Sequence, residues 1–121
     1  MVDHARSDNP VLDRLLIAAG QQRISGVDLS LDRIERLLKR MASPHLKIPP
    51  VFHVAGTNGK GSTCAFLRAA LEAAGHRVHV FTSPHLVRVN ERIRVAGTLV
   101  SDEDFAEALA DVLRFNAGQP L

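Results

Sequence analysis

Several residue types that define whole classes of proteins are rare in this sequence. Its 121 residues include one cysteine, no tryptophan and no tyrosine. The single cysteine, Cys64, cannot form an intramolecular disulfide, so a disulfide-stapled secreted fold is excluded. With only five Phe as aromatic residues, any core must be built mainly from Leu, Val, Ile and Ala.

Long apolar runs and targeting signals are also missing. Residues 1–10 are polar and lack the apolar region of a signal peptide, and no run approaches the roughly 18 residues that span a bilayer. The excess of Lys and Arg over Asp and Glu, 15 against 13, decides nothing about nucleic acid. The basic residues are nevertheless interleaved with acidic ones, whereas nucleic-acid binders usually carry a clustered basic face. We expect a cytoplasmic protein without a nucleic-acid or membrane partner.

Apolar spacing predicts three helices outside the middle of the chain. Asn9 and Pro10 are typical of an N-cap and a first helical position, and they precede a helix over residues 11–19. Ser30 caps a second helix with an apolar face, and Ser101 caps the last one. The apolar face of the second helix consists of Leu31, Ile34, Leu37, Leu38 and Met41.

The middle of the chain predicts a strand–helix–strand unit. Residues 51–55 are mostly apolar and suit a strand buried on both faces. A helix is expected over residues 62–74 and a second strand over 78–81, parallel to the first. Residues 91–100 alternate well enough for a short extended pair around Ala96 and Gly97.

These elements predict an α/β fold with a mainly parallel sheet. Two convincing parallel strands would leave much Leu and Val surface uncovered, so we expect an incomplete domain. We divide the chain into an N-terminal helix with its connector, residues 1–27, and the first part of an α/β domain, residues 28–121.

A glycine loop between the first strand and its helix is the most informative motif. Glycines let successive backbone N–H groups converge, and the helix N-terminus adds partial positive charge, which together suit a phosphate. The lysine adds a full charge that can reach phosphate oxygens. The spacing departs from the common pattern, in which five residues rather than three separate the glycines and Ser or Thr follows the lysine. The predicted ATP-phosphate contacts are Gly56, Thr57, Asn58, Gly59, Lys60, Gly61 and Ser62, with Lys60 also catalytic.

Ser83 follows the strand predicted over residues 78–81 and therefore lies at the edge of the sheet where ligands bind in open α/β folds. Its position alone fits a magnesium ligand and a plain turn equally well. His53 and His79 lie within predicted strands and are expected to be structural. Glu91 and Arg92 fit either a contact with substrate or a role in holding their own loop.

Two segments together resemble one enzyme family. They are Val54-Ala55-Gly56-Thr57-Asn58-Gly59-Lys60-Gly61-Ser62-Thr63 and Thr82-Ser83-Pro84-His85-Leu86-Val87-Arg88-Val89-Asn90-Glu91-Arg92-Ile93. The chain resembles the bifunctional dihydrofolate synthase/folylpolyglutamate synthases, a branch of the Mur ligase superfamily. The similarity covers roughly residues 28–113. It implies that residues 28–121 are the first part of an ATP-binding domain with a three-layer fold of the P-loop type.

The resemblance implies an ATP-dependent amide ligase. Such an enzyme uses MgATP to convert the carboxylate of dihydropteroate or a folate into an acyl phosphate, which the amino group of L-glutamate attacks. It also implies that Ser83 is a magnesium ligand and that Asp28 and Leu29 bind substrate. The remaining magnesium ligands and the glutamate-binding domain are expected beyond residue 121, so the chain alone should be inactive and the intact enzyme a monomer. The competing interpretations are a muramyl-peptide ligase and a non-catalytic nucleotide-binding module.

Overall fold

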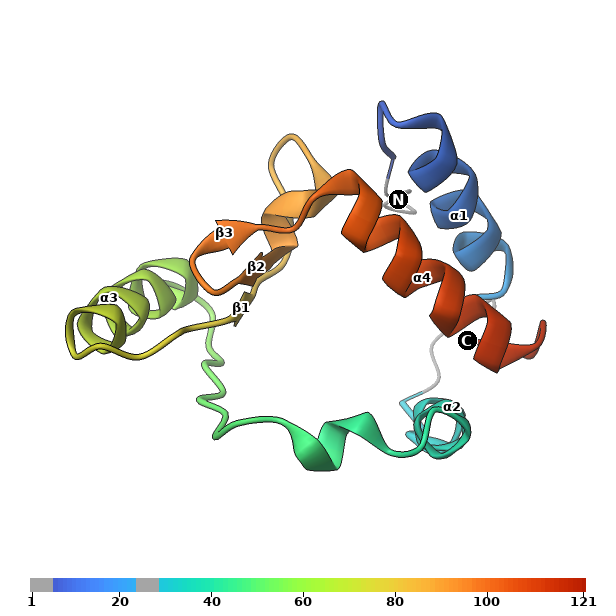
Figure 1. The fold of residues 1–121 in the computed structure, drawn as a ribbon. Helices are drawn as coiled ribbons and strands as arrows, with labels where there is room; N and C mark the ends of the chain where they lie inside the picture. The colour runs from blue at the N-terminus through green and yellow to red at the C-terminus, as the bar shows by residue number, and fades with distance from the viewer. Residues whose placement is uncertain (1–5, 24–28) are drawn as a thin grey trace. The chain divides into compact units, whose positions relative to one another are not determined.

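The computed structural model describes residues 6–23 and 29–121, which form two compact units (Figure 1). The first is helical and combines residues up to 49 with residues 102–121. The second comprises residues 50–101 and contains the glycine loop. The domain boundary predicted after residue 27 falls in a stretch outside the described residues and stays a prediction. No described helix is long and apolar enough to cross a membrane.

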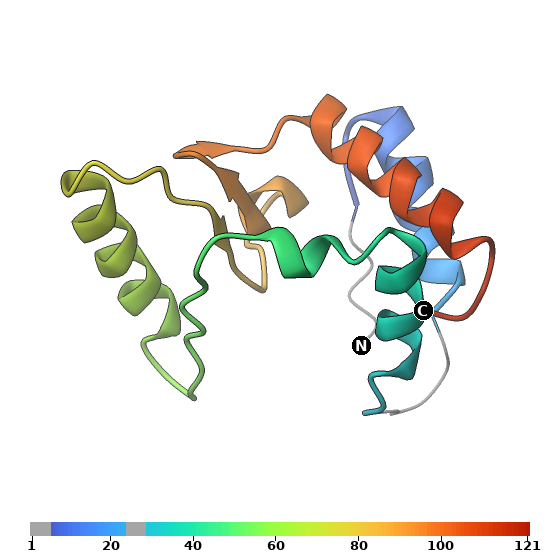
Figure 2. The ribbon, with the colours of Figure 1, turned by 60° about the horizontal axis from the view of Figure 1, so that its bottom comes forward.

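The helical unit is built around α1, Pro10–Gln21, and α4, Asp102–Asn116, which lie side by side (Figures 1 and 2). The predicted N-cap of α1 is confirmed, because the Asn9 side-chain oxygen accepts the N–H groups of Val11 and Leu12 at 3.0 and 3.1 Å. Leu12 is completely buried. The centre of this unit therefore forms between two helices that lie about 90 residues apart in the chain.

The helix α2, Asp32–Arg40, also packs on α4 and precedes a short 3₁₀ helix, η1, Pro44–Lys47. Ser30 supports its start by accepting the N–H of Asp32 at 3.1 Å. The apolar face predicted for α2 is covered only in part, since Leu37 is buried while most of the other positions are partly or largely exposed. The pattern located the helix correctly, although this unit covers only a strip of it.

A polar cluster fastens the end of the chain to the helical unit. The side-chain amide of Asn116, which is 1% exposed, donates to the Gln22 side chain and to the Gln119 carbonyl at 2.7 and 2.6 Å. The N–H of Leu121 donates to the Gln22 carbonyl at 2.7 Å. Arg36 of α2 reaches the Pro120 carbonyl at 2.9 Å. The segment after α4 is thus held against both α1 and α2.

The second unit contains α3, Lys60–Ala73, and a three-stranded sheet in the order β1-β2-β3. The strands are Val80–Phe81, Ile93–Val95 and Thr98–Leu99, and the 3₁₀ helix η2, Val89–Arg92, precedes β2. The extended pair predicted around Ala96 and Gly97 is confirmed as the hairpin β2–β3. Both turn residues have positive φ, 49° and 89°, which the favoured two-residue hairpin turns require.

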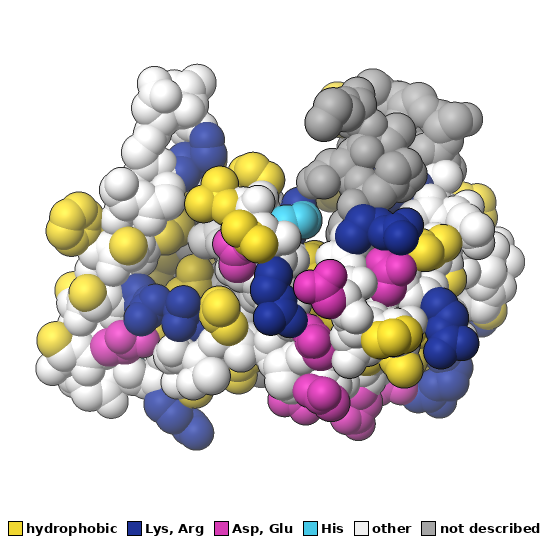
Figure 3. Space-filling model, turned by 90° about the horizontal axis from the view of Figure 1, so that it is seen from above, with side chains coloured by type: hydrophobic (Ala, Val, Ile, Leu, Met, Phe, Trp, Pro, Cys, Tyr) yellow, Lys and Arg dark blue, Asp and Glu magenta, His cyan; other side chains and the backbone are white. Residues whose placement is uncertain are grey.

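The predicted parallel sheet is wrong for the described residues, whose strands all pair antiparallel. Residues 51–55 form no strand, and Val51 and Phe52 are 69% and 65% exposed instead of buried on both faces. A strand needs a paired neighbour, and β1 pairs with β2, the edge presented by the nearby hairpin. Hydrophobic side chains accordingly reach the surface between charged ones, as the face in Figure 3 shows.

Candidate functional site

The glycine loop turns the extended segment before it into the helix α3 (Figure 2). Gly59 is the N-cap of α3 with φ of 72°, and Gly56 opens the loop with φ of 148°. Residues other than glycine rarely adopt these left-handed backbone conformations. The two glycines therefore allow the chain to reverse direction within four residues. The predicted helix is confirmed, and it begins at Lys60, two residues earlier than expected.

Backbone donors gather at the start of α3. The first N–H groups of a helix have no partner within it. The N–H of Thr63 donates to the Gly59 carbonyl at 3.0 Å, and the Thr63 hydroxyl donates to the same oxygen at 2.8 Å. The N–H groups of Gly61 and Ser62 precede this first bond, and no hydrogen bond within residues 6–23 and 29–121 uses them. They lie where the helix dipole adds positive potential.

Lys60 adds a full positive charge to these donors. Its ammonium group donates to the Gly56 carbonyl and so bends back over the loop. Every residue from Gly56 to Thr63 is exposed, so the ammonium group and the N–H groups are accessible from solvent. The loop combines an accessible cation, accessible N–H groups and the hydroxyl of Ser62, and these groups suit a phosphate ester or anhydride.

Ser83 follows β1 and is exposed. Next to it, the N–H of Thr82 donates to the Arg92 carbonyl at 2.9 Å, so the chain leaves the sheet at Ser83. No hydrogen bond in residues 6–23 and 29–121 joins Ser83 to the glycine loop. The same residues contain no group of three or more His, Cys, Asp or Glu that could hold a metal ion.

The predicted substrate contacts are Asp28 and Leu29. Asp28 falls outside the described residues, so nothing is known of its placement. Leu29 is described and is 89% exposed. The structure therefore does not bring Leu29 into a site, and both assignments stay predictions.

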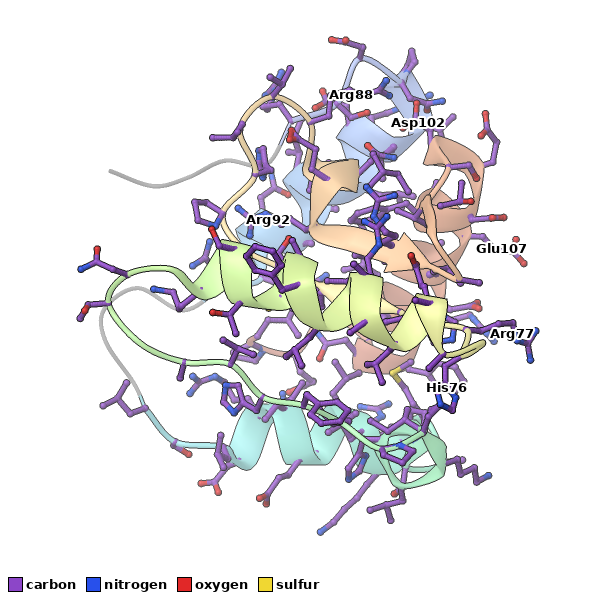
Figure 4. The ribbon with its side chains drawn as sticks, turned by 90° about the vertical axis from the view of Figure 1, so that its left-hand side faces the viewer. His76, Arg77, Arg88, Arg92, Asp102 and Glu107 are labelled. Carbon is purple, nitrogen blue, oxygen red and sulfur yellow. The ribbon has the colours of Figure 1, made fainter. Side chains whose placement is uncertain are left out.

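The loop after Ser83 is held by its own side chains. The Glu91 carboxylate accepts the N–H groups of Val87 and Arg88 at 2.7 and 2.6 Å. These bonds, that from Arg88 above all, hold the pKa of Glu91 below its ordinary value. Arg92 donates from Nε to Nδ1 of His85 at 2.7 Å, and Figure 4 shows where Arg88 and Arg92 lie. Two roles were left open for Glu91 and Arg92, contact with substrate and support of their own loop. The structure shows the second role for both side chains.

Asn90 is a structural residue that sequence reasoning missed. It is 6% exposed, and its side-chain amide donates to the Val100 carbonyl at 2.9 Å. The N–H of Val100 donates to the Ile93 carbonyl at 2.9 Å, so the loop is tied to both strands of the hairpin. The structural role predicted for His79 is confirmed, because its Nδ1 accepts the N–H of Ala96 at 3.0 Å. A sequence signal for this loop was Glu91 at the third position of η2, from which its carboxylate accepts the N–H of the residue before the helix.

Comparisons with known proteins confirm the predicted resemblance. No protein-family model matches the chain. The chain is 51% identical over 80 residues to a Bacillus subtilis protein named dihydrofolate synthase/folylpolyglutamate synthase. The match covers 66% of this chain and 18% of that protein.

Solved structures agree. The crystal structure of the bifunctional folylpolyglutamate synthase/dihydrofolate synthase from Yersinia pestis CO92 matches with a TM-score of 0.80 at 37% identity. The match covers 91% of this chain and 27% of the Yersinia pestis chain. A second structure of the Yersinia pestis enzyme, complexed with AMPPNP and Mn ion, matches with a TM-score of 0.65 at 30% identity, over 90% of this chain and 31% of that one. The chain thus spans less than a third of the proteins that it resembles.

Proposed function

We propose that residues 56–62 bind the phosphates of MgATP. The observation that carries this proposal is the start of α3, where Lys60 and the N–H groups of Gly61 and Ser62 are exposed beside the left-handed Gly59. The confirmed resemblance supports it, because one of the matched structures is a complex with AMPPNP, a nucleotide. A surface turn that happens to contain a lysine would not require two glycines with positive φ, a lysine and accessible N–H groups together in one loop.

The groups at this loop fit a nucleoside triphosphate with its magnesium ion. The N–H groups and Lys60 are donors for phosphate oxygens, and Ser83 offers a hydroxyl oxygen of the kind that Mg²⁺ prefers. The Thr63 hydroxyl already donates to the Gly59 carbonyl, which leaves Ser62 as the freer hydroxyl of the first turn. Bound MgATP would supply the phosphoryl group that activates a carboxylate. The residues of this chain hold and orient its phosphates and balance their charge.

We further propose that the chain contributes this phosphate site to a larger ligase of the cytoplasm. That ligase joins L-glutamate to the carboxylate of dihydropteroate or of a folate through an acyl phosphate. The proposal rests on the names of the matched proteins, of which the chain spans about a fifth to under a third. We infer that the isolated chain binds nucleotide without turning it over, and that residues outside it complete the metal site. Amide formation by the 121-residue chain alone would contradict this inference.

Calorimetric titration of MgATP into the chain tests the phosphate site. We expect saturable binding that is lost in Lys60→Ala. Lys47→Ala is the matched control, because Lys47 is an exposed lysine of the helical unit and should leave binding unchanged. Equal affinities in all three proteins, or no binding by the unaltered chain, would overturn the proposal. Repeating the titration with ATP and EDTA, and with Ser83→Ala, separates the contribution of the metal ion.

A further inference from the structure

The division into two units reveals a charge asymmetry that the whole sequence conceals. Residues 50–101 contain six Lys or Arg, two Glu and no Asp, a net charge of +4. The remaining residues contain nine Lys or Arg and eleven Asp or Glu, a net charge of −2. The nearly even balance of the chain, +2 in total, therefore hides a strongly basic unit. This unit also carries the glycine loop.

Both carboxylates of the basic unit are engaged within it. Glu72 forms an ion pair with Arg68 at 3.2 Å, one turn apart on α3. Glu91 accepts two backbone N–H groups of its own loop, from Val87 and Arg88. Each acidic side chain is thus held close to positive charge or to backbone donors, and both are already counted in the net charge of +4.

The cations of this unit are spread over several elements. Lys60 begins α3 and Arg77 follows its C-terminal end, so the two lie at opposite ends of the helix (Figure 4). Arg88 belongs to the loop before η2. All three are exposed. The positive charge therefore forms a field around the unit and does not come from a single contact point.

The range of this field matches the size of the unit. A compact body of this length has a radius of gyration of roughly 10 Å. Salt screens charges over about 10 Å at 0.1 M and about 30 Å at 0.01 M ionic strength. At low salt, every cation of the unit therefore acts on an anion that approaches any part of its surface. Fields of this kind raise the association rate of oppositely charged ligands.

We propose that the basic unit formed by residues 50–101 steers polyanionic ligands, MgATP and inorganic triphosphate among them, to the glycine loop. Cations that never touch the ligand, Arg77 first, raise its association rate through the field of the unit. This inference rests on the proposed phosphate site and adds how that site captures its ligand. It assigns a role to charges that neither the motif nor the hydrogen bonds of the loop involve.

Stopped-flow binding of a fluorescent methylanthraniloyl ATP with Mg²⁺ tests the proposal. It is measured at pH 8, from 0.01 to 0.5 M ionic strength. Arg77→Glu lowers the charge of the unit by two. For a ligand of charge −2 about 20 Å away in water, Coulomb's law gives roughly a two- to fourfold slower association at low salt. Glu72→Gln removes a negative charge and should accelerate association. Arg77→Lys is the matched control and should match the unaltered chain.

The outcomes separate steering from contact. Association rates that follow the charge of each variant, converge at 0.5 M and leave the dissociation rate unchanged support the proposal. Identical association rates in all variants, or a change confined to dissociation, would overturn it. Circular dichroism checks that each variant is folded, and the salt dependence of the unaltered chain tests steering without any substitution. Absence of binding by the unaltered chain would instead refute the phosphate site, and the steering proposal with it.

Discussion

Two glycines of the glycine loop, Gly59 and Gly61, allow the backbone argument to be tested within three residues. Gly59 has φ of 72° and caps α3, whereas Gly61 lies inside the helix. A Cβ atom added at either position meets no other heavy atom within 4 Å. Alanine therefore causes no steric clash at either site, and the two substitutions differ mainly in backbone conformation.

The expected effects have opposite signs. Left-handed conformation costs alanine roughly 1–2 kcal/mol, so Gly59→Ala should disfavour the loop by that amount. Within a helix, alanine is more stable than glycine by roughly 0.5–1 kcal/mol, so Gly61→Ala should stabilise α3 slightly. Because each 1.4 kcal/mol is tenfold in affinity, Gly59→Ala should weaken MgATP binding by roughly 5- to 30-fold. Gly59→Asn should lose less, since Asn tolerates this region better.

Calorimetric titration of MgATP into the three variants and the unaltered chain measures the difference. Thermal unfolding followed by circular dichroism records the stability of each protein in parallel. Equal losses of affinity in Gly59→Ala and Gly61→Ala would refute the reasoning, because the effect would then come from the added methyl group and not from the backbone conformation.

Two further predictions concern stability. The lowered pKa of Glu91 means that its bonds to the N–H groups of Val87 and Arg88 stabilise the loop fully above the ordinary value of 4.5. This contribution is lost as the pH falls through the lower folded-state pKa. Protection of the Val87 and Arg88 amides against exchange, taken relative to the intrinsic rate at each pH, should fall in that window and should be low at all pH values in Glu91→Ala. Unchanged protection in the variant would contradict the assignment. Leu12→Ala should lower the free energy of unfolding by roughly 2–5 kcal/mol, since Leu12 is fully buried. Denaturant unfolding checks this against Leu46→Ala, at a 77% exposed position, where almost no change is expected.

Local signals in the sequence located most of the helices and the hairpin. Asn9 caps α1 as predicted, and the turn at Ala96 and Gly97 joins β2 to β3. These features depend on residues that lie within a few positions of one another. The strand predicted over residues 51–55 was wrong because strand formation depends on contacts with segments outside the local sequence. An apolar run shows what a segment can do, but a strand also needs a partner, and no described segment pairs with this one.

The sequence located the glycine loop of the candidate site but did not decide the roles of residues in the loop after Ser83. The glycine loop was identified because its chemistry lies in consecutive residues, from Gly56 to Ser62. The roles of Glu91 and Arg92 were left open, since pairing with substrate and pairing within the loop require the same residue types. Only the structure shows that Glu91 accepts backbone N–H groups of its own loop and that Arg92 donates to His85.

By itself, the sequence indicated the helices, the hairpin turn, the glycine loop and the resemblance to folate ligases. Each of these follows from short-range stereochemistry or from consecutive side chains. The tertiary structure decided which strands pair, that residues 102–121 pack with the helices of residues 1–49, and that residues 50–101 therefore form a separate unit by contacts, which is basic. Contacts between distant segments depend on which partners each segment finds and on the entropy of closing the chain between them. Neither quantity can be read from a local pattern.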